Sequence, residues 1–414
     1  MARKYLPDET LVINEGGSPI YFLGSDDYRS AYFMLCDLAL KNGASIDKIG
    51  LQHHTFTGST SKTEEEYEKA LEVIYSELAN FKKPKNFTAN LTPDKFCDTI
   101  SALIDKSKRS EMENQLREQI LKLKNDKNAV ILAHYYAPAE AQSIADYVGD
   151  SFYLAKVAKK STADIIVFCG VSFMGESAKI LNPDKKVLMP DLTADCPMAH
   201  MVAEGKIKEM RDKHDDLAVV CYINSTAELK RQSDVCVTSS GAIKIVKALP
   251  NKNIFFIPDR NLGKFVAAQV PEKNIIINDG CCPIHASITK EQLLEQKLLH
   301  PAAPILIHPE CEPELLEISD YVGSTAEIID YVAKSPLDEF IVCTEDGVDY
   351  QLITDNPQKR FYYPNPRPCC VDMKLNTLGN ILSVLEKEDN EVIVDETVAM
   401  EARKPLDRML ELGR

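Results

Sequence analysis

The stretch AVILAHYY, residues 129–136, occurs in three related forms in this chain. The other two are LAVVCYIN at 217–224 and APILIHPE at 303–310, which follow at offsets of 88 and 86 residues. Each form is an apolar run typical of a buried β-strand, and each ends in polar residues. Equal spacing and equal context predict a threefold internal repeat with a unit of about 87 residues.

Other predicted elements recur with the same spacing. The segment DYVGDS at 146–151 matches DVCVTS at 234–239 and DYVGST at 320–325. A third strand follows at 165–169, 254–257 and 340–344, and a fourth strand leads to a cysteine in each unit. Helical stretches lie between the strands, at 173–181, 242–249 and 326–333. Strands that alternate with helices predict parallel four-stranded sheets covered by helices.

We therefore expect an α/β fold of three tandem αβα domains related by pseudo-threefold symmetry, with an N-terminal α/β extension. The predicted boundaries are 1–110 for an N-terminal accessory domain, 111–212, 213–300 and 301–388 for the three repeats, and 389–414 for a C-terminal segment packed on the core. Ligands of open parallel sheets bind beyond the carboxyl ends of the strands. The polar ends of the first strands should therefore meet the cysteines in one region.

The N-terminal extension carries no chemical motif. Its predicted elements are a hairpin of strands 11–13 and 20–23, helices at 28–41 and 62–81, a polar loop at His53-His54 and a linker at 82–98. We expect an accessory or interaction role for it.

Composition narrows the class of protein. The chain has 414 residues, is 44% hydrophobic and 27% charged, and carries a net charge of −15, which argues against a nucleic-acid partner. It contains no apolar run of membrane-spanning length and no apolar signal core at its N-terminus. A cytoplasmic setting without membrane association follows, in which thiols stay reduced.

Most of the 12 cysteines fall in apolar runs and are expected to be core residues, and no CxxC pair occurs. Cys196, Cys282 and Cys370 differ, because each follows the fourth strand of its repeat. The adjacent pairs at 281–282 and 369–370 leave the choice within each pair open. Three thiolates from three domains suit an iron–sulfur cluster with one open iron, although spacing alone does not separate iron from zinc.

Two further sets of repeat-equivalent residues are polar. The first strands end in His134, Tyr222 and His308, followed two positions later by Tyr136, Asn224 and Glu310. Residues two apart on a strand face the same way, so these side chains should converge and suit proton transfer or carbonyl and carboxylate recognition. The alternative is that they only cap loops. The second set, Ser151, Ser239 and Thr325, would cap helix N-termini and at the same time bind anions.

The motifs also resemble those of a known family, quinolinate synthase (NadA). The matching segments are AHYY at 133–136, GDS at 149–151, FMGE at 173–176, AKIL at 178–181, ADC at 194–196, YIN at 222–224, TSS at 238–240, GCCPIH at 280–285, HPE at 308–310, GST at 323–325, CVDMK at 370–374 and KPLDRML at 404–410. They extend from about residue 111 to 412. Within the adjacent cysteine pairs, the family patterns G-x-C-x-V-H (here with Ile284 for Val) and C-x-x-M select Cys282 and Cys370.

The resemblance implies a reaction and a cofactor. Enzymes of this family condense iminoaspartate (iminosuccinate) with dihydroxyacetone phosphate to quinolinate, phosphate and water, an early step of NAD biosynthesis. They are transferases that hold a [4Fe-4S] cluster with one iron not ligated by protein. L-Aspartate oxidase or aspartate dehydrogenase is the expected source of iminoaspartate. The alternative from another class is a non-catalytic iron–sulfur sensor, and a zinc hydrolase lacks any supporting motif.

The resemblance also assigns expected roles to the residues of this chain. Tyr136 and Glu310 are expected to transfer protons, with His308 and Tyr222 also catalytic. The expected substrate-binding residues are His134, Ser151, Tyr222, Ile223, Asn224, Ser239, His308, Pro309, Glu310 and Thr325, and His285 should reach the same cavity. The expected metal ligands are Cys196, Cys282 and Cys370.

Overall fold

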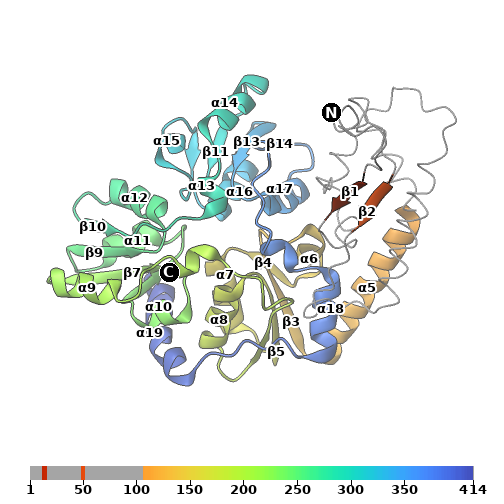
Figure 1. Ribbon diagram of the computed structural model, residues 1–414, viewed down its shortest axis with the longest axis horizontal. Helices are drawn as coiled ribbons and strands as arrows, with labels where there is room; N and C mark the ends of the chain where they lie inside the picture. The colour runs from red at the N-terminus through yellow and green to blue at the C-terminus, as the bar shows by residue number, and fades with distance from the viewer. Residues whose placement is uncertain (1–11, 16–47, 52–105, 414) are drawn as a thin grey trace. The chain divides into compact units, whose positions relative to one another are not determined.

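The computed structural model describes residues 12–15, 48–51 and 106–413 (Figure 1). The chain divides into two compact units, Met1–Met112 and Glu113–Arg414. In the first unit, β1 (Val12–Glu15) pairs in parallel with β2 (Lys48–Leu51). The helix α5 (Lys106–Asp126) leads into the second unit. The strand predicted at 20–23, the helices at 28–41 and 62–81, the His53-His54 loop and the linker at 82–98 lie outside the described residues.

The second unit begins with a parallel four-stranded sheet of order β4-β3-β5-β6. Its central strand β3 is buried along nearly its whole length, which explains why its sequence is a continuous apolar run. The elements of this first domain are β3 (Ala129–His134), α6 (Ala139–Ile144), β4 (Tyr147–Gly149), α7 (Ser151–Lys160), β5 (Ile165–Cys169), α8 (Ser172–Leu181), β6 (Lys186–Leu188), η2 (Pro197–His200) and α9 (Lys206–Lys213).

Two more sheets repeat this arrangement. The second has the order β10-β9-β7-β8 and the third β12-β11-β13-β14, so the first strand of each domain always lies between its second and third strands. The second domain contains β7 (Leu217–Tyr222), α10 (Ala227–Arg231), β8 (Val235–Val237), α11 (Ala242–Ala248), β9 (Asn253–Ile257), α12 (Arg260–Gln269), β10 (Asn274–Ile277), α13 (Pro283–Ala286) and α14 (Lys290–Leu299). The third contains β11 (Ile305–Ile307), α15 (Pro313–Leu316), β12 (Tyr321–Val322), α16 (Thr325–Lys334), β13 (Glu339–Cys343), η3 (Asp346–Val348), α17 (Asp349–Asp355), β14 (Arg360–Tyr362) and η4 (Met373–Leu375).

The predicted α/β fold with three parallel four-stranded sheets is confirmed. A carboxylate at the start of each second strand explains part of the repeat. Asp146, Asp234 and Asp320 each accept the main-chain amide of a first-strand residue, at 2.8, 2.7 and 2.8 Å. These bonds fix the two strands at the amino end of each sheet.

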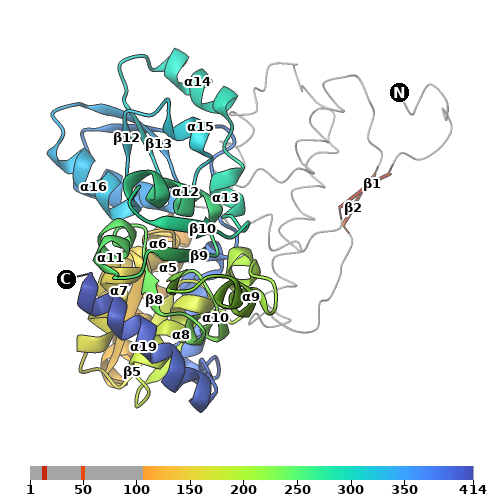
Figure 2. The same ribbon diagram turned by 90° about the vertical axis from the view of Figure 1, so that its left-hand side faces the viewer.

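Two C-terminal helices pack on the first and second sheets, which precede them in sequence. The helix α18 (Leu378–Lys387) packs on α6 and β5 of the first domain, where Ile381 and Leu385 join the core beneath Ile131. The helix α19 (Glu396–Leu412) packs on α10, β8 and α8, across the first and second domains (Figure 2). The predicted domain boundaries at 212, 300 and 388 stay a prediction. Within the residues that the structure describes, no helix combines the length and the apolar character needed to cross a bilayer.

Candidate active site

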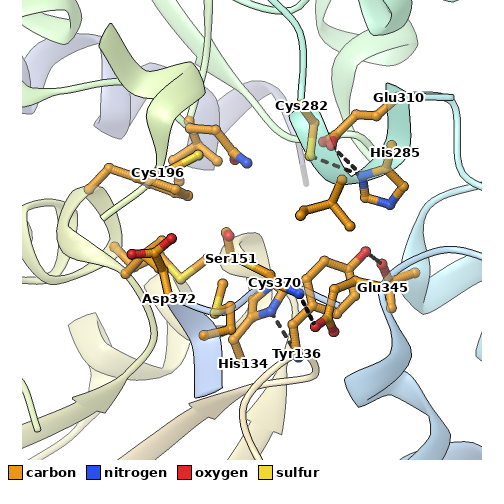
Figure 3. A pocket seen from close by; sticks show the side chains of 18 of the residues that line it. His134, Tyr136, Ser151, Cys196, Cys282, His285, Glu310, Glu345, Cys370 and Asp372 are labelled. Carbon is orange, nitrogen blue, oxygen red and sulfur yellow. Dashed lines mark hydrogen bonds and ion pairs between the residues drawn. The ribbon is translucent and has the colours of Figure 1, made fainter. Parts of the chain in front are cut away.

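The ends of the first strands of all three domains meet at one cavity of about 240 Å³ (Figure 3). The predicted site residues that line it are His134, Tyr136, Ser151, Cys196, Tyr222, Ile223, Asn224, Ser239, Cys282, His308, Glu310, Thr325 and Cys370. Pro309 is buried but is not among the lining residues.

Two helices at the cavity, α7 and α16, have N-cap residues one position before those predicted from the sequence. Ser151 and Thr325 do not cap their helices, because the caps are the preceding residues: Asp150 accepts the Tyr153 amide, and Ser324 forms a capping box with Glu327. In the second repeat the helix α11 begins only at Ala242, so Ser239 lies before the helix and does not cap it. The reading of these hydroxyls as N-caps was wrong. The hydroxyls of Ser151 and Thr325 therefore stand at helix N-termini without a capping role.

His134 and His308 occupy equivalent positions and have the same local geometry. The amide of Tyr136 donates to Nδ1 of His134 at 3.1 Å, and the amide of Glu310 donates to Nδ1 of His308 at 3.3 Å. A neutral ring that accepts at Nδ1 carries its proton on Nε2. Burial lowers the pKa of both rings to about 3, so both are neutral at pH 7. Each therefore presents a neutral Nε2–H donor.

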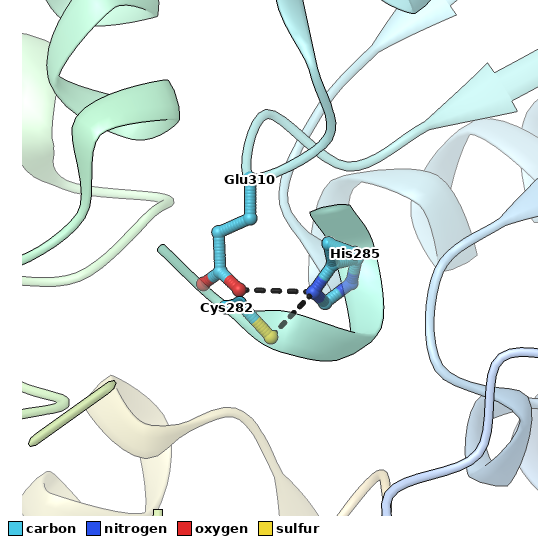
Figure 4. A group of neighbouring side chains, drawn as sticks. All are labelled: Cys282, His285 and Glu310. Atoms are coloured by element: carbon cyan, nitrogen blue, oxygen red, sulfur yellow. Dashed lines mark hydrogen bonds and ion pairs between the residues drawn. The ribbon is translucent and has the colours of Figure 1, made fainter. Parts of the chain in front are cut away.

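Glu310 is the buried carboxylate of the cavity, with 3% of its surface exposed. The Tyr222 hydroxyl donates to its Oε1, and Nδ1 of His285 lies 2.9 Å from its Oε2 (Figure 4). Burial by itself raises the pKa of Glu310. The attraction of His285 and the hydrogen bonds from His285 and Tyr222 outweigh it, so the pKa lies below its ordinary value. Glu310 is therefore ionised at neutral pH.

Tyr136 is connected to this carboxylate by hydrogen bonds. Its hydroxyl lies 2.7 Å from Oγ1 of Thr344, which lies 2.9 Å from Nε2 of His285. Its hydroxyl also lies 2.6 Å from Oγ1 of Thr325. Burial and the nearby Glu310 charge raise the pKa of Tyr136 well above the ordinary value, so the phenol keeps its proton. The same two causes raise the pKa of Tyr222.

The three cysteines come from three different domains and line the same cavity (Figure 3). Burial raises the pKa of Cys196 to about 12, with smaller contributions from Glu310 and Cys370, and the pKa of Cys282 is raised by burial, Glu310 and Cys196. Thiols that raise one another's pKa in a buried cavity suit a cationic group that offsets their charge.

The spacing of the sulfur atoms tests which kind of metal group the cysteines fit. Among the described residues, no set of three potential ligand atoms within 4.8 Å of one another includes Cys196 or Cys370. Thiolates that share one cavity but not one coordination sphere fit the separate corners of an iron–sulfur cluster better than a single tetrahedral zinc ion.

Two tighter groups of potential ligands do occur. One is Cys282, His285 and Glu310 (Figure 4), and the other is Glu345, Asp346 and Cys369. In the second group the ammonium of Lys374 already lies 2.8 Å from Glu345 and 2.9 Å from Asp346. This one lysine already pairs with both carboxylates and offsets part of their charge.

Several functional contacts were not predicted from the sequence. Asp150 and Glu345 line the cavity, and Thr344 joins Tyr136 to His285. A signal was available, because Thr344 and Glu345 directly follow the third strand of their repeat. They therefore lie at the sheet edge where α/β proteins bind ligands.

The fold and the cavity define a class of protein: an α/β protein of three parallel four-stranded sheets whose equivalent strand ends build one shared, cysteine-lined polar cavity, as enzymes do for small substrates. A family model described as "Quinolinate synthetase A protein" matches residues 118–411. The quinolinate synthase of Caldicellulosiruptor saccharolyticus is 50% identical over 299 residues, 72% of this chain and 99% of that protein. The corresponding protein of Fusobacterium nucleatum is 50% identical over 298 residues, 72% of this chain and 99% of its own length.

A third relative, the quinolinate synthase of Clostridioides difficile, is 48% identical over 302 residues, 73% of this chain and 99% of that protein. The chain belongs to the quinolinate synthase family, a family of enzymes, as the motifs predicted. The family match begins after the N-terminal extension, so residues 1–110 lie outside it.

Proposed function

We propose that this protein condenses iminoaspartate with dihydroxyacetone phosphate and releases quinolinate, phosphate and water, as a transferase of NAD biosynthesis. One observation carries the proposal: three cysteines, one from each repeat, line the same cavity as the buried network that joins Tyr136, Glu310 and Tyr222. The family match supports it.

Cys196, Cys282 and Cys370 are the proposed ligands of a [4Fe-4S] cluster. Three cysteine ligands leave one iron without a protein ligand, and such an iron, when bound, supplies a Lewis acid for a substrate oxygen. The adjacent Cys281 and Cys369 are not lining residues of the cavity, which supports the choice within each pair.

Neutral hydrogen-bond donors of this acidic protein bind the two anionic substrates. Ser151 and Thr325 stand at the N-termini of α7 and α16, where free amides and the helix dipole favour carboxylate or phosphate. Ser239 and Asn224 add a hydroxyl and an amide, and Ile223 contributes apolar surface. The Nε2–H groups of His134 and His308 donate without bringing a positive charge.

Proton transfer falls to the phenols and the carboxylate. A condensation of this kind removes protons beside a carbonyl or imine and protonates the oxygen that leaves. Glu310 is ionised and suits the accepting role, while Tyr136 and Tyr222 keep their protons and suit the donating role. The bonds through Thr344 and His285 connect Tyr136 with Glu310, so a proton can be redistributed between them without bulk water.

We place the reaction in the cytoplasm, supported by the described cysteines, all of which are free thiols. L-Aspartate oxidase or aspartate dehydrogenase is the proposed supplier of iminoaspartate, and residues 1–110 are proposed to be an accessory or interaction domain. Neither nucleic acid nor membrane is a proposed partner.

The decisive experiment is an anaerobic assay of the purified full chain. Iminoaspartate generated from oxaloacetate and ammonia is mixed with dihydroxyacetone phosphate, and quinolinate is measured. We expect a brown protein with about four irons per chain that forms quinolinate. A cluster-loaded protein that forms none would instead support the iron–sulfur sensor. A colourless zinc protein that forms quinolinate would refute the proposed cofactor.

A further inference from the structure

A second pseudo-threefold position lies just beyond the third strand of each domain. It is two residues after the end of β5, β9 and β13, and it is occupied by Val171, Asp259 and Glu345. Each of the three is the N-cap residue of the helix that follows, α8, α12 or η3. Asp259 is fully buried and Glu345 is 1% exposed, so two of the three domains bury a carboxylate here.

Capping explains only one oxygen of each carboxylate. Oδ1 of Asp259 accepts the amide of Leu262 at 2.6 Å, and Oε2 of Glu345 accepts the amide of Gly347 at 2.7 Å. The second oxygen reaches farther along the chain. Oδ2 of Asp259 accepts the main-chain amide of Cys282 at 3.0 Å.

Glu345 makes the equivalent second bond. Its Oε1 accepts the main-chain amide of Cys370, also at 3.0 Å. The two cysteines lie 23 and 25 residues beyond their carboxylates. Helix capping requires neither bond, and the same device at the same repeat position indicates a common role.

We propose that Asp259 and Glu345 are positioning residues that hold the Cys282 and Cys370 loops in the geometry needed to bind the cluster. The inference rests on the proposed cluster function. Burial makes such bonds important for position, because a main-chain amide that lost its acceptor away from water would be left without a partner.

The Glu345 anchor extends to the catalytic network. The Lys374 ammonium lies 2.8 Å from Oε1 of Glu345 and donates to the main-chain oxygen of Tyr136 at 3.1 Å. The loop of Cys370 in the third domain is thereby tied to the strand end that carries Tyr136 in the first. Glu345 thus positions a cysteine and a tyrosine together.

The first domain lacks this anchor. Val171 offers no side-chain acceptor, so the loop of Cys196 has no equivalent carboxylate at this position. The three cluster loops are therefore held unequally, because only those of Cys282 and Cys370 have a buried carboxylate anchor at this position.

The anchors also have an electronic consequence. A cysteine amide that donates to a carboxylate does not donate to a cluster sulfur, and fewer such hydrogen bonds lower the potential of a cluster. An amide side chain of the same size that no longer accepts from the cysteine amide should leave that amide free to donate to a cluster sulfur, so the potential should become more positive. A purely structural role would leave this readout unchanged.

The test uses Asp259→Asn and Glu345→Gln in the full chain, loaded with its cluster anaerobically. Each amide retains one accepting oxygen and loses the other, so one of the two main-chain bonds is lost. The control is Asp234→Asn, because Asp234 also accepts a main-chain amide in the second domain, at 2.7 Å, but at the amino end of the sheet. Iron release to a chelator, the midpoint potential and the electron paramagnetic resonance spectrum of the reduced cluster are measured.

We expect both anchor variants to release iron about tenfold faster than wild type, the factor for one lost hydrogen bond. We also expect a more positive potential and an altered spectrum, with the Asp234→Asn protein like wild type in all three. Anchor variants that match the Asp234→Asn protein would overturn the inference while leaving the cluster function intact. A wild-type chain that holds no iron would overturn both. Glu345→Gln remains an independent test if Asp259→Asn does not fold.

Discussion

Replacing Glu310 with glutamine should abolish most turnover while leaving the cluster in place. The carboxylate is 3% exposed and accepts from the Tyr222 hydroxyl and from His285, whose Nδ1 lies 2.9 Å away. A glutamine amide retains one accepting oxygen and turns an NH₂ group toward the other donor. One charge-assisted hydrogen bond contributes about 1.5–3 kcal/mol, or roughly ten- to a hundredfold in rate. Loss of a general base costs about 10²–10⁴-fold.

We therefore expect kcat for quinolinate formation to fall at least about a hundredfold, with iron content and cluster absorbance unchanged. The matched control is Glu312→Gln, two residues away, where the carboxylate is 27% exposed and pairs with Arg260 outside the network. The control should stay within about threefold of wild type, since a surface ion pair contributes little. Full turnover of the Glu310→Gln protein in the anaerobic assay would remove this carboxylate from the mechanism.

Three further outcomes follow from the same geometry. Cys282→Ser should lose most of its iron while Cys281→Ser keeps it, and equal iron content in the two proteins, measured after anaerobic loading, would contradict the assignment. Gly347→Ala should lower the free energy of unfolding, measured by urea titration, by about 1–3 kcal/mol. The reason is that a new Cβ would lie 2.7 Å from the main chain of Tyr136. Because burial lowers the pKa of His134 and His308 to about 3, below the ordinary 6.5, the unfolded chain binds protons first as the pH falls. As the pH falls below 6.5, the free energy of unfolding should therefore decrease by roughly 1 kcal/mol per histidine per pH unit. A free energy of unfolding that stays constant between pH 6 and 4 would refute the conclusion that both rings are buried and neutral.

The repeat in the sequence was sufficient to predict three parallel sheets. Central strands buried on both faces need continuous apolar runs, and β3, β7 and β11 carry such runs at nearly equal spacing. The sequence did not predict in the same way which helix packs on which sheet. Leu385 of α18 comes after the third sheet in sequence but packs on the first sheet, because the pattern of a helix shows which of its faces is apolar and not which sheet it meets.

Helix starts show the same limit on a smaller scale. The segments GDS and GST predicted helix N-termini, but the residue that caps each one is Asp150 or Ser324 rather than the hydroxyl that follows. Capping depends on one residue having extended backbone while its side chain reaches an amide three positions on. A shift of one residue is below the resolution of a sequence pattern, yet here it decides which hydroxyls have no capping role.

The sequence by itself determined the repeat, the polar strand ends and the three cysteines that follow the fourth strands. These features depend on local periodicity and on spacing, which a linear chain records directly. Only the tertiary structure decided which of these groups touch. Tyr136 meets Thr344 across 208 residues, and Cys370 meets Glu345 through a main-chain amide that no side-chain pattern reveals. Such bonds arise from how the three domains close around the cavity, so they become visible only once the strand ends are in place.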